Sequence, residues 1–164
     1  MIIRNTTLSD LPEVMNIYAG AREFMAKTGN PKQWGATNWP PEDLIKDDIA
    51  QKHSYVCEHE GKLAAVFYFN SGISIDPCYD NITDGAWIGD ENYGVVHRIA
   101  SSQDVKGAGG FCIDWAYSQC GHLRMDTHGD NKVMQKCLIK HGFKQCGVIY
   151  VVEDNDPRLA YERL

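Results

Sequence analysis

Apolar and polar residues alternate along this chain with two periods. Runs in which every second residue is apolar predict strands, and stretches with apolar residues three or four apart predict helices. Helical spacing is clear at Leu11, Val14, Tyr18, Ala21 and Met25. The predicted elements, in chain order, are a strand at 2–7, a helix from Ser9 to Gly29, a helix at 41–52, strands at 54–58, 63–70 and 94–101, a helix at 109–119, a strand at 123–127, a helix ending at Gly142, and strands at 143–152 and 158–163. This order predicts one mixed α/β domain over residues 1–164.

Several residues mark where the predicted helices begin and end. Ser9 is placed to cap the first helix, and either Thr127 or Asp130 to cap the last one. Gly121 and Gly142 follow the two later helices, at the position where a left-handed residue commonly closes a helix. These signals support the predicted boundaries.

Three connecting segments carry further predictions. Residues 71–92 form a connection that is long for a compact domain, and such loops are usually functional, so we interpret this one as a lid over an acceptor. Trp34 and Trp39 lie in an earlier loop, where they are predicted to line the acceptor pocket or, equally, to pack over a sheet edge. A tight turn is predicted at Asp154–Pro157.

Composition and charge exclude several classes of protein. Of the 164 residues, 43% are hydrophobic and 23% are charged, which is typical of a globular domain. The net charge is −6 and Lys and Arg do not cluster, which disfavours nucleic acid and anionic membranes as partners. No apolar run reaches the roughly 18 residues of a membrane span. The opening residues lack a signal-peptide pattern, and the six cysteines show no zinc spacing, so we expect a cytoplasmic protein without a metal.

The segment with the clearest chemistry is the glycine-rich turn Val105–Gly110. It connects a predicted strand directly to a predicted helix, and three of its last four residues are glycine. Glycines allow the backbone to approach a ligand closely, and the unpaired N–H groups at a helix start attract anions. The turn is therefore a candidate site for a pyrophosphate, although a purely structural tight turn explains the glycines equally well.

Two common phosphate-binding patterns do not fit this turn. The pattern G-x-x-x-x-G-K-[ST] of nucleotide-hydrolysing proteins is absent from the sequence. The dinucleotide pattern G-x-G-x-x-G fails because Cys112 stands at its last glycine, and that pattern belongs after the first strand of a fold. Nucleotide hydrolysis and dinucleotide binding are both disfavoured.

The downstream sequence resembles the GNAT family of N-acetyltransferases. Members of that family carry an Arg/Gln-x-x-Gly-x-Gly/Ala turn that binds coenzyme A, then a strand, then a helix that opens with Asn and ends in Gly-Phe. Here Asn131 precedes Gly142 and Phe143 by eleven and twelve residues, which is the family's spacing. The opening residues 2–7, with Asp10 soon after, also resemble the first strand and turn of the family. The resemblance covers essentially the whole chain.

This resemblance implies a fold and a set of cofactor contacts. The expected fold is a mixed, mostly antiparallel sheet of about seven strands flanked by about four helices. Acetyl-coenzyme A is the implied cosubstrate, with its pantetheine arm along one strand, its pyrophosphate on the glycine turn and an asparagine beside it. The corresponding residues are Ile99, Ala100 and Ser101 on the strand, Lys106, Gly107, Ala108, Gly109 and Gly110 on the turn, and Asn131, whose alternative role is to start a helix.

The match to the family is loose at two points. If Lys106 takes the Arg/Gln position, Gly109 fits but Phe111 stands at the last small position; if Asp104 takes it, both glycines fit but an acid replaces the base. We favour Lys106 because a cation near phosphates is electrostatically sensible. The tyrosine that many members place four residues before Gly-Phe is Leu138 here, so the usual acid is missing.

Acetyl transfer to an amine requires a neutral nucleophile, and it often uses an acid for the departing thiolate. His97 is the candidate base, because strand alternation places it on the same face as Ile99 and Ser101. Tyr150 is the candidate acid by residue type, with Tyr161 as an alternative. Structural roles remain open for all three side chains.

The sequence therefore predicts an acetyl-CoA-dependent N-acetyltransferase. Its expected acceptor is a primary amine of a small molecule or peptide, which attacks the thioester directly in a ternary complex. The alternative is a non-catalytic acyl-CoA-binding module, which the missing tyrosine keeps open. Members of the family often form dimers, so the resemblance leaves a homodimer open.

Overall fold

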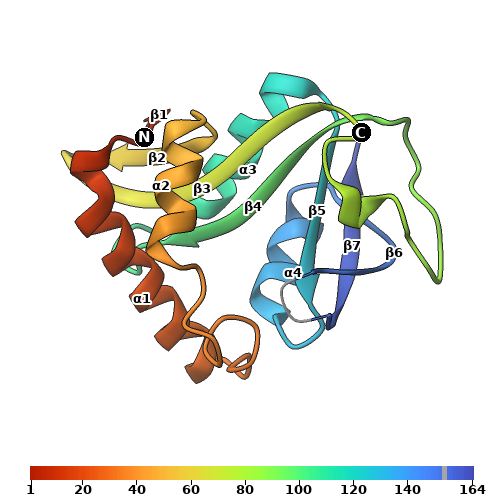
Figure 1. Ribbon diagram of the computed structural model, residues 1–164, viewed down its shortest axis with the longest axis horizontal. Coiled ribbons are helices and arrows are strands. Elements are labelled where there is room, and N and C mark those ends of the chain that lie inside the picture. Colours follow the sequence, from red (N-terminus) through yellow and green to blue (C-terminus); the bar gives the residue numbers. More distant parts are fainter. Residues whose placement is uncertain (153–154) are drawn as a thin grey trace. The chain divides into compact units, whose positions relative to one another are not determined.

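A computed structural model of the protein describes residues 1–152 and 155–164 (Figure 1). Its helices and strands follow one another in the predicted order β α α β β β α β α β β. The elements are β1 Ile2–Asn5, α1 Leu11–Lys27, α2 Glu42–Ala50, β2 Ser54–His59, β3 Lys62–Ile73, β4 Asn92–Ser101, α3 Ala108–Cys120, β5 Leu123–His128, α4 Lys132–Lys140, β6 Lys144–Tyr150 and β7 Pro157–Arg163, with 3-10 turns η1 Leu8–Asp10 and η2 Pro77–Tyr79. Among the described residues, the expected seven strands and four helices are confirmed.

The seven strands form one sheet in the order β1-β2-β3-β4-β5-β7-β6. Strands β1 and β2, β2 and β3, β5 and β7, and β6 and β7 pair antiparallel. Strands β4 and β5 pair parallel, with Gly94 opposite Leu123 and Val95 opposite Arg124. The prediction of a mixed, mostly antiparallel sheet is confirmed.

The chain divides into two compact units, each built from two segments. The first unit comprises Met1–Phe69 and His97–Ile113, and the second comprises Asn70–Val96 and Asp114–Leu164. Strands β3 and β4 and helix α3 each begin in one unit and end in the other. The turn that precedes α3 therefore belongs to the first unit, and the Gly-Phe end of α4 belongs to the second.

The first unit is built around the apolar face of α1. Val14, Tyr18 and Ala21, which lie at helical spacing, pack in one cluster with Val56 of β2 and Val66 of β3. Figure 1 shows α1 and α2 lying against these strands. Burial of a side chain of this size contributes about 1.5–3 kcal/mol, so the predicted stripe supplies the main packing of this unit.

The start of α1 differs from the prediction. Asp10, not Ser9, is the N-cap of α1, and the turn η1, whose own N-cap is Thr7, leads into the helix. The Thr7 N–H and hydroxyl both donate to the Asp10 carboxylate at 2.8 Å. Arg4 contacts the same carboxylate at 2.7 Å, and its hydrogen bond holds the pKa of Asp10 well below its usual value. The turn from Thr7 to Asp10, held by the Asp10 carboxylate, therefore takes the place of the predicted cap at Ser9.

Helix α4 in the second unit ends in a Schellman motif. Gly142 has a φ of +83°, and its N–H donates to the Ile139 carbonyl at 3.1 Å. The Phe143 N–H donates to the Leu138 carbonyl at 3.0 Å, and both side chains are buried. This pairing of carbonyls and amides is the characteristic closure of a helix by a left-handed glycine followed by an apolar residue. The Gly-Phe pair thus has a clear structural role.

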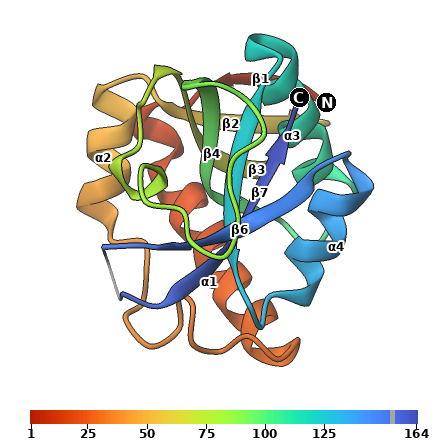
Figure 2. The ribbon, with the colours of Figure 1, turned by 90° about the vertical axis from the view of Figure 1, so that its right-hand side faces the viewer.

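The loop at residues 71–92 packs onto the strands of the second unit. Thr83 pairs with Val148 of β6, and Figure 2 shows the loop, in green, running beside that strand. Tyr79 is buried, its hydroxyl donates to Asp126 of β5 at 2.8 Å, and its carbonyl accepts the Trp87 indole N–H at 2.8 Å. These contacts tie the middle of the loop to its own unit, so we do not retain the interpretation of the whole loop as a lid.

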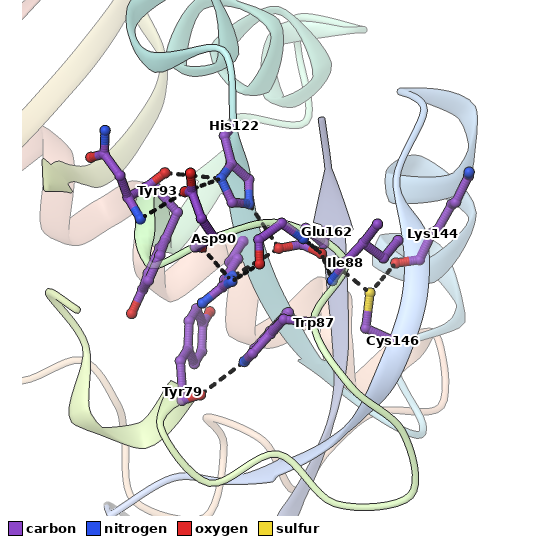
Figure 3. A network of polar contacts seen from close by, with 12 residues as sticks. Tyr79, Trp87, Ile88, Asp90, Tyr93, His122, Lys144, Cys146 and Glu162 are labelled. Carbon is purple, nitrogen blue, oxygen red and sulfur yellow. Dashed lines mark hydrogen bonds and ion pairs between the residues drawn. The ribbon is translucent and has the colours of Figure 1, made fainter. Parts of the chain in front are cut away.

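A buried charge network anchors the end of this loop (Figure 3). The fully buried carboxylate of Glu162 in β7 accepts hydrogen bonds from the backbone N–H groups of Ile88 and Gly89. It also contacts His122 Nε2 at 2.7 Å and accepts from Arg124 Nε at 2.9 Å. One carboxylate thereby joins β7, β5 and the loop.

Two further sequence predictions concern the turn at residues 154–157 and the presence of a membrane span. Asp154 of the predicted turn lies outside the described residues, while Pro157 begins β7. In the described part of the chain, no helix combines the length and the apolar character needed to cross a bilayer.

Candidate functional site

The glycine-rich turn forms the transition from β4 to α3 in the first unit. Gly107 has a φ of +84°, a conformation that favours glycine, and a side chain there would face open space. The Phe111 N–H donates to the Gly107 carbonyl at 3.0 Å. The amides of residues 108–110 therefore precede the hydrogen-bonded ladder of the helix, as amides do at a helix N-terminus.

The residues of this turn fit an anionic group. Gly109 approaches the strand so closely that an added Cβ would lie 3.0 Å from Ser101 Oγ, so only a glycine fits there without displacement. Lys106 is exposed beside these amides, and Ala108 and Gly110 are buried. A backbone cradle, a positive helix end and one exposed cation are what a pyrophosphate requires.

A cavity of about 280 Å³ adjoins the turn within the first unit. Its walls come from α1, the start of β3 and the segment that links β4 to the turn; they include Glu13, Asn16, Lys62, Ser101, Asp104 and Val105. The lining side chains are mainly polar or charged. The predicted strand residue Ser101 and the predicted turn thus border one concave surface.

A buried ion pair lies in β4, close before the predicted pantetheine residues. Arg98 donates to the Asp48 carboxylate of α2 through Nη2 at 2.8 Å and Nε at 3.2 Å. The Arg98 carbonyl accepts the Tyr18 hydroxyl of α1 at 2.9 Å. Burial raises the pKa of Asp48 despite the opposing effect of Arg98. The φ of Arg98 is +51°, which is unusual for a residue other than glycine.

The position of His97 corrects the alternation argument. The His97 ring lies 5.8 Å from the Tyr68 ring, and the guanidinium of the next residue, Arg98, lies 4.7 Å from the same ring. Consecutive side chains of a regular strand point to opposite faces. Since both reach Tyr68, the left-handed Arg98 interrupts the alternation, and the sequence argument that grouped His97 with Ile99 and Ser101 does not hold.

The two tryptophans lie in the loop between α1 and α2. Trp34 packs against the core cluster, with its ring 5.9 Å from Tyr18 in an edge-to-face arrangement. The Trp39 N–H donates to the Trp34 carbonyl at 3.0 Å, and the Trp39 carbonyl accepts from Arg22 at 3.1 Å. Trp34 is therefore linked through Tyr18 to the carbonyl of Arg98, which places one predicted acceptor residue near β4.

Asn131 and Tyr150 belong to the second unit. Asn131, rather than Thr127 or Asp130, is the N-cap of α4, and its side-chain oxygen accepts the Met134 N–H at 3.1 Å. Tyr150 ends β6 opposite Pro157 and is 49% exposed. Leu138, which stands at the family's tyrosine position, is fully buried in α4. Asn131 thus has the structural role that the sequence left open.

Several site residues were not found from the sequence. Asp48, Arg98 and Tyr18 meet only because α1, α2 and β4 pack together, and Tyr18 was assigned to a helix stripe alone. The network at Glu162 was also missed, because its partners lie more than thirty residues away in sequence. Within the described residues, no group of three or more His, Cys, Asp or Glu side chains could hold a metal ion.

Comparisons with known proteins place this arrangement among acetyltransferases. Neither a family model nor a curated protein matches the sequence. A solved structure of a GNAT-family acetyltransferase from Streptococcus agalactiae superposes with a TM-score of 0.89 at 30% identity, covering 99% of this chain and 94% of that one.

More distant structures share the fold. A GNAT-family acetyltransferase from Listeria monocytogenes has a TM-score of 0.69 at 16% identity, covering 99% of this chain and 93% of that one. A ribosomal-protein-alanine N-acetyltransferase from Brucella melitensis has a TM-score of 0.67 at 16% identity, covering 100% of this chain and 99% of that one. The similarity extends over at least 93% of each chain in these pairs.

Proposed function

Since the chain belongs to the GNAT family of acetyltransferases, we propose that it transfers an acetyl group from acetyl-coenzyme A to a primary amine of a small molecule or peptide. The family and the fold support acetyl transfer in general. The observation that supports the donor assignment is the turn at residues 105–110, where a left-handed Gly107 and the first amides of α3 follow β4 and would form a cradle for an anion.

The chain offers a contact for each part of the donor. The amides of residues 106–110 would hold the pyrophosphate, with Lys106 supplying a positive charge, and Asn131 would lie beside the cofactor. The backbone of Ile99, Ala100 and Ser101 would pair with the pantetheine arm. When bound, the donor supplies an activated thioester; transfer forms the amide C–N bond and breaks the C–S bond.

Direct attack by the acceptor amine agrees with the state of the cysteines. Burial raises the pKa of the thiols of Cys57, Cys112, Cys120 and Cys137, and it raises that of Cys146 to about 11. A thiol with a raised pKa holds little thiolate near neutral pH, and the thiolate is the nucleophile. These five side chains are poor candidates for a covalent acyl carrier.

Proton movements are assigned to two side chains. His97 would accept the proton that the ammonium group of the acceptor loses, directly or through water, because an imidazole can exchange protons near neutral pH. Tyr150 would give a proton to the departing thiolate. Both assignments rest on residue type, with His97 partly buried in β4 and Tyr150 exposed at the end of β6.

Ligand-dependent stability tests the donor assignment. We expect coenzyme A and acetyl-coenzyme A to raise the melting temperature, because a ligand that binds the folded state stabilises it, and we expect ATP to leave it unchanged. The absence of a response to both coenzyme A species would remove the donor assignment. A response to all three ligands would indicate a general phosphate site instead.

A charge reversal locates the pyrophosphate. Lys106→Glu is expected to weaken coenzyme A binding about tenfold or more, because it replaces a charge-assisted contact by repulsion. Lys136→Glu, at an exposed position of α4, is the matched control and should bind normally. A substitution at Gly109 is a poorer test, because its side chain would press on Ser101. Equal affinities of the two variants, measured by calorimetry, would place the pyrophosphate elsewhere.

Thiol release from acetyl-coenzyme A, screened against a panel of amines, separates an enzyme from a binding module. Binding without amine-dependent release would favour the module. For an active acceptor, His97→Ala should lower kcat/KM most below about pH 8, where the amine is protonated. A profile that matches the wild type from pH 6 to 9 would reject His97 as the base. The cytoplasmic location and the homodimer stay predictions.

A further inference from the structure

Arg98 holds an unfavourable backbone conformation in the middle of β4. Its φ of +51° places it in the left-handed region, which is unfavourable for a residue with a Cβ. Such conformations persist only where the surrounding structure holds them, and they gather at functional sites. The next three residues, 99–101, are those assigned to the pantetheine arm.

Three elements hold this residue in place. Tyr18 of α1 donates its hydroxyl to the Arg98 carbonyl at 2.9 Å. Asp48 of α2 accepts two hydrogen bonds from Nη2 of the guanidinium, at 2.8 and 2.9 Å, and one from Nε. The ring of Tyr68 in β3 lies 4.7 Å from the guanidinium carbon. Backbone and side chain of one residue are thereby fixed from three directions.

The ion pair within this group is a weak source of stability. The side chains of Arg98 and Asp48 are only 14% and 9% exposed, so both charges have lost most of their water. The raised pKa of Asp48 shows that burial outweighs the attraction of Arg98. Replacing such a pair by apolar side chains is often neutral or stabilising. Backbone strain and a buried ion pair therefore occur together at Arg98, and neither is explained by a contribution to the stability of the fold.

The positive φ of Arg98 changes the direction of the backbone groups that follow it in β4. A regular strand would send His97 and Arg98 to opposite faces, but both lie against Tyr68. A left-handed residue in a strand re-aims the N–H and C=O groups that follow it, which is the effect of a β-bulge. The groups re-aimed here are those of residues 99–101.

We infer that Tyr18, Asp48 and Arg98 form a brace that holds β4 in the kinked conformation to which coenzyme A binds. Arg98 and Asp48 are then positioning residues, which act on the donor through the backbone of residues 99–101. This inference rests on the proposed acetyl transfer. It assigns the ion pair to the geometry of the donor strand and not to contact with either substrate.

Two double variants separate the backbone from the charge. Asp48→Asn with Arg98→Gly removes the pair and places at position 98 a residue that adopts positive φ without strain. Asp48→Asn with Arg98→Ala removes the same pair but keeps a Cβ in the left-handed conformation. Neither variant leaves a buried charge unpaired. The two differ in the cost of the kink alone.

The expected result is a difference in affinity for coenzyme A. Without the brace, the left-handed cost of roughly 1–2 kcal/mol lowers the population of the kinked strand in the alanine variant, and apparent affinity falls with the competent fraction. We expect the alanine variant to bind coenzyme A about tenfold more weakly than the glycine variant in calorimetry. In turnover, KM for acetyl-coenzyme A should rise by the same factor while kcat stays unchanged.

A matched control removes general effects of left-handed residues. Lys52, which follows α2, has a φ of +60° and lies far along the chain from the strand residues 99–101. Lys52→Gly and Lys52→Ala should differ in melting temperature, because the same backbone cost applies, but they should bind coenzyme A equally. Tyr18→Phe should weaken binding less than the alanine variant, and the addition of Arg98→Gly and Asp48→Asn should restore it.

The outcomes are distinct. If the folded glycine and alanine variants bind coenzyme A with equal affinity, whether strong or weak, the brace does not serve the conformation of β4. If the wild-type protein binds no coenzyme A, the proposed function fails first. If the wild type binds coenzyme A but acetylates no amine, the affinity comparison still decides the inference.

Discussion

The protein has a buried arginine–carboxylate pair in each unit, and the two pairs differ in how deeply they are buried and in how many donors the carboxylate has. Arg98 and Asp48 in the first unit are 14% and 9% exposed, whereas Arg124 and Glu162 in the second are 6% and 0% exposed. The more deeply buried carboxylate has the more complete set of donors. Glu162 accepts from Ile88, Gly89 and Arg124 and contacts His122, while Asp48 is held by the guanidinium of Arg98.

The pKa values of the two carboxyls move in opposite directions. Burial alone would raise the pKa of Glu162, but the hydrogen bonds from Arg124, His122, Ile88 and Gly89 lower it overall. Burial dominates at Asp48, where the pKa is raised. A buried carboxylate stabilises a fold when donors replace its lost water. By that measure the pair of Arg124 and Glu162 stabilises the fold, whereas the pair of Arg98 and Asp48, beside the candidate site, lowers its stability.

The largest expected effect comes from breaking the second pair. Glu162→Gln keeps the shape of the side chain but leaves Arg124 buried without its counter-charge, so we expect a loss of about 3–5 kcal/mol in the free energy of unfolding. Urea denaturation at neutral pH measures it. Glu91→Gln, at an exposed position, is the control and should change stability little. A similar small change for Glu162→Gln would mean that the network adds nothing to stability.

The same change in the first pair should cost less. Asp48→Asn leaves Arg98 unpaired, but it also removes a carboxylate that burial already disfavours, so a loss of about 1–2 kcal/mol is expected in the same assay. The ranking is the sharper statement. If Asp48→Asn destabilised the protein more than Glu162→Gln, the contrast drawn from the two pKa shifts would be reversed.

Acidification should bring the two losses closer together. Ionised Glu162 contributes stability above the ordinary pKa of a glutamate, and this contribution disappears as pH falls through its lowered pKa. Asp48 contributes most in its protonated form, and this contribution is lost as pH rises through its raised pKa. Between about pH 6 and pH 3, the loss caused by Glu162→Gln should shrink and that caused by Asp48→Asn should grow. Parallel changes would contradict the assigned directions.

The smallest expected loss of stability comes from removing an uncharged hydrogen bond, the side-chain cap of α4. Asn131→Ala removes the side-chain cap of α4 and should cost about 1 kcal/mol, while Asn131→Asp keeps an acceptor for the Met134 N–H and should cost little. Thermal unfolding of both variants checks this. If the cap is the main role of Asn131, the aspartate variant should also bind coenzyme A as the wild type does, apart from the repulsion of its added charge.

Local signals predicted most of the fold. The stripe on α1 and the glycines after α3 and α4 act within one or two turns of chain, so residue type alone carried the information. Ser9 failed as a cap because Asp10 and Arg4 together favour the turn that opens at Thr7. The capping choice depends on a salt bridge between elements, which periodicity does not encode.

The candidate site divides in the same way. The turn at residues 105–110 was predicted because a run of glycines indicates a backbone conformation, such as the positive φ of Gly107, that other residues rarely adopt. Arg98 gave no such signal: an arginine in a strand does not predict a positive φ, and its partners Tyr18 and Asp48 are eighty and fifty residues away. The alternation argument for His97 failed at Arg98, since alternation holds only where every residue of a strand is extended, and the role of His97 as the base stays a prediction.

The left-handed Arg98 also shapes how this position can change over generations. Every arginine codon is a single base change from a glycine codon, so one point mutation removes the backbone strain and the guanidinium together. After that mutation the carboxylate of Asp48 is still buried but has lost the guanidinium that paired with it. A glycine at position 98 is therefore best tolerated together with a neutral side chain at position 48.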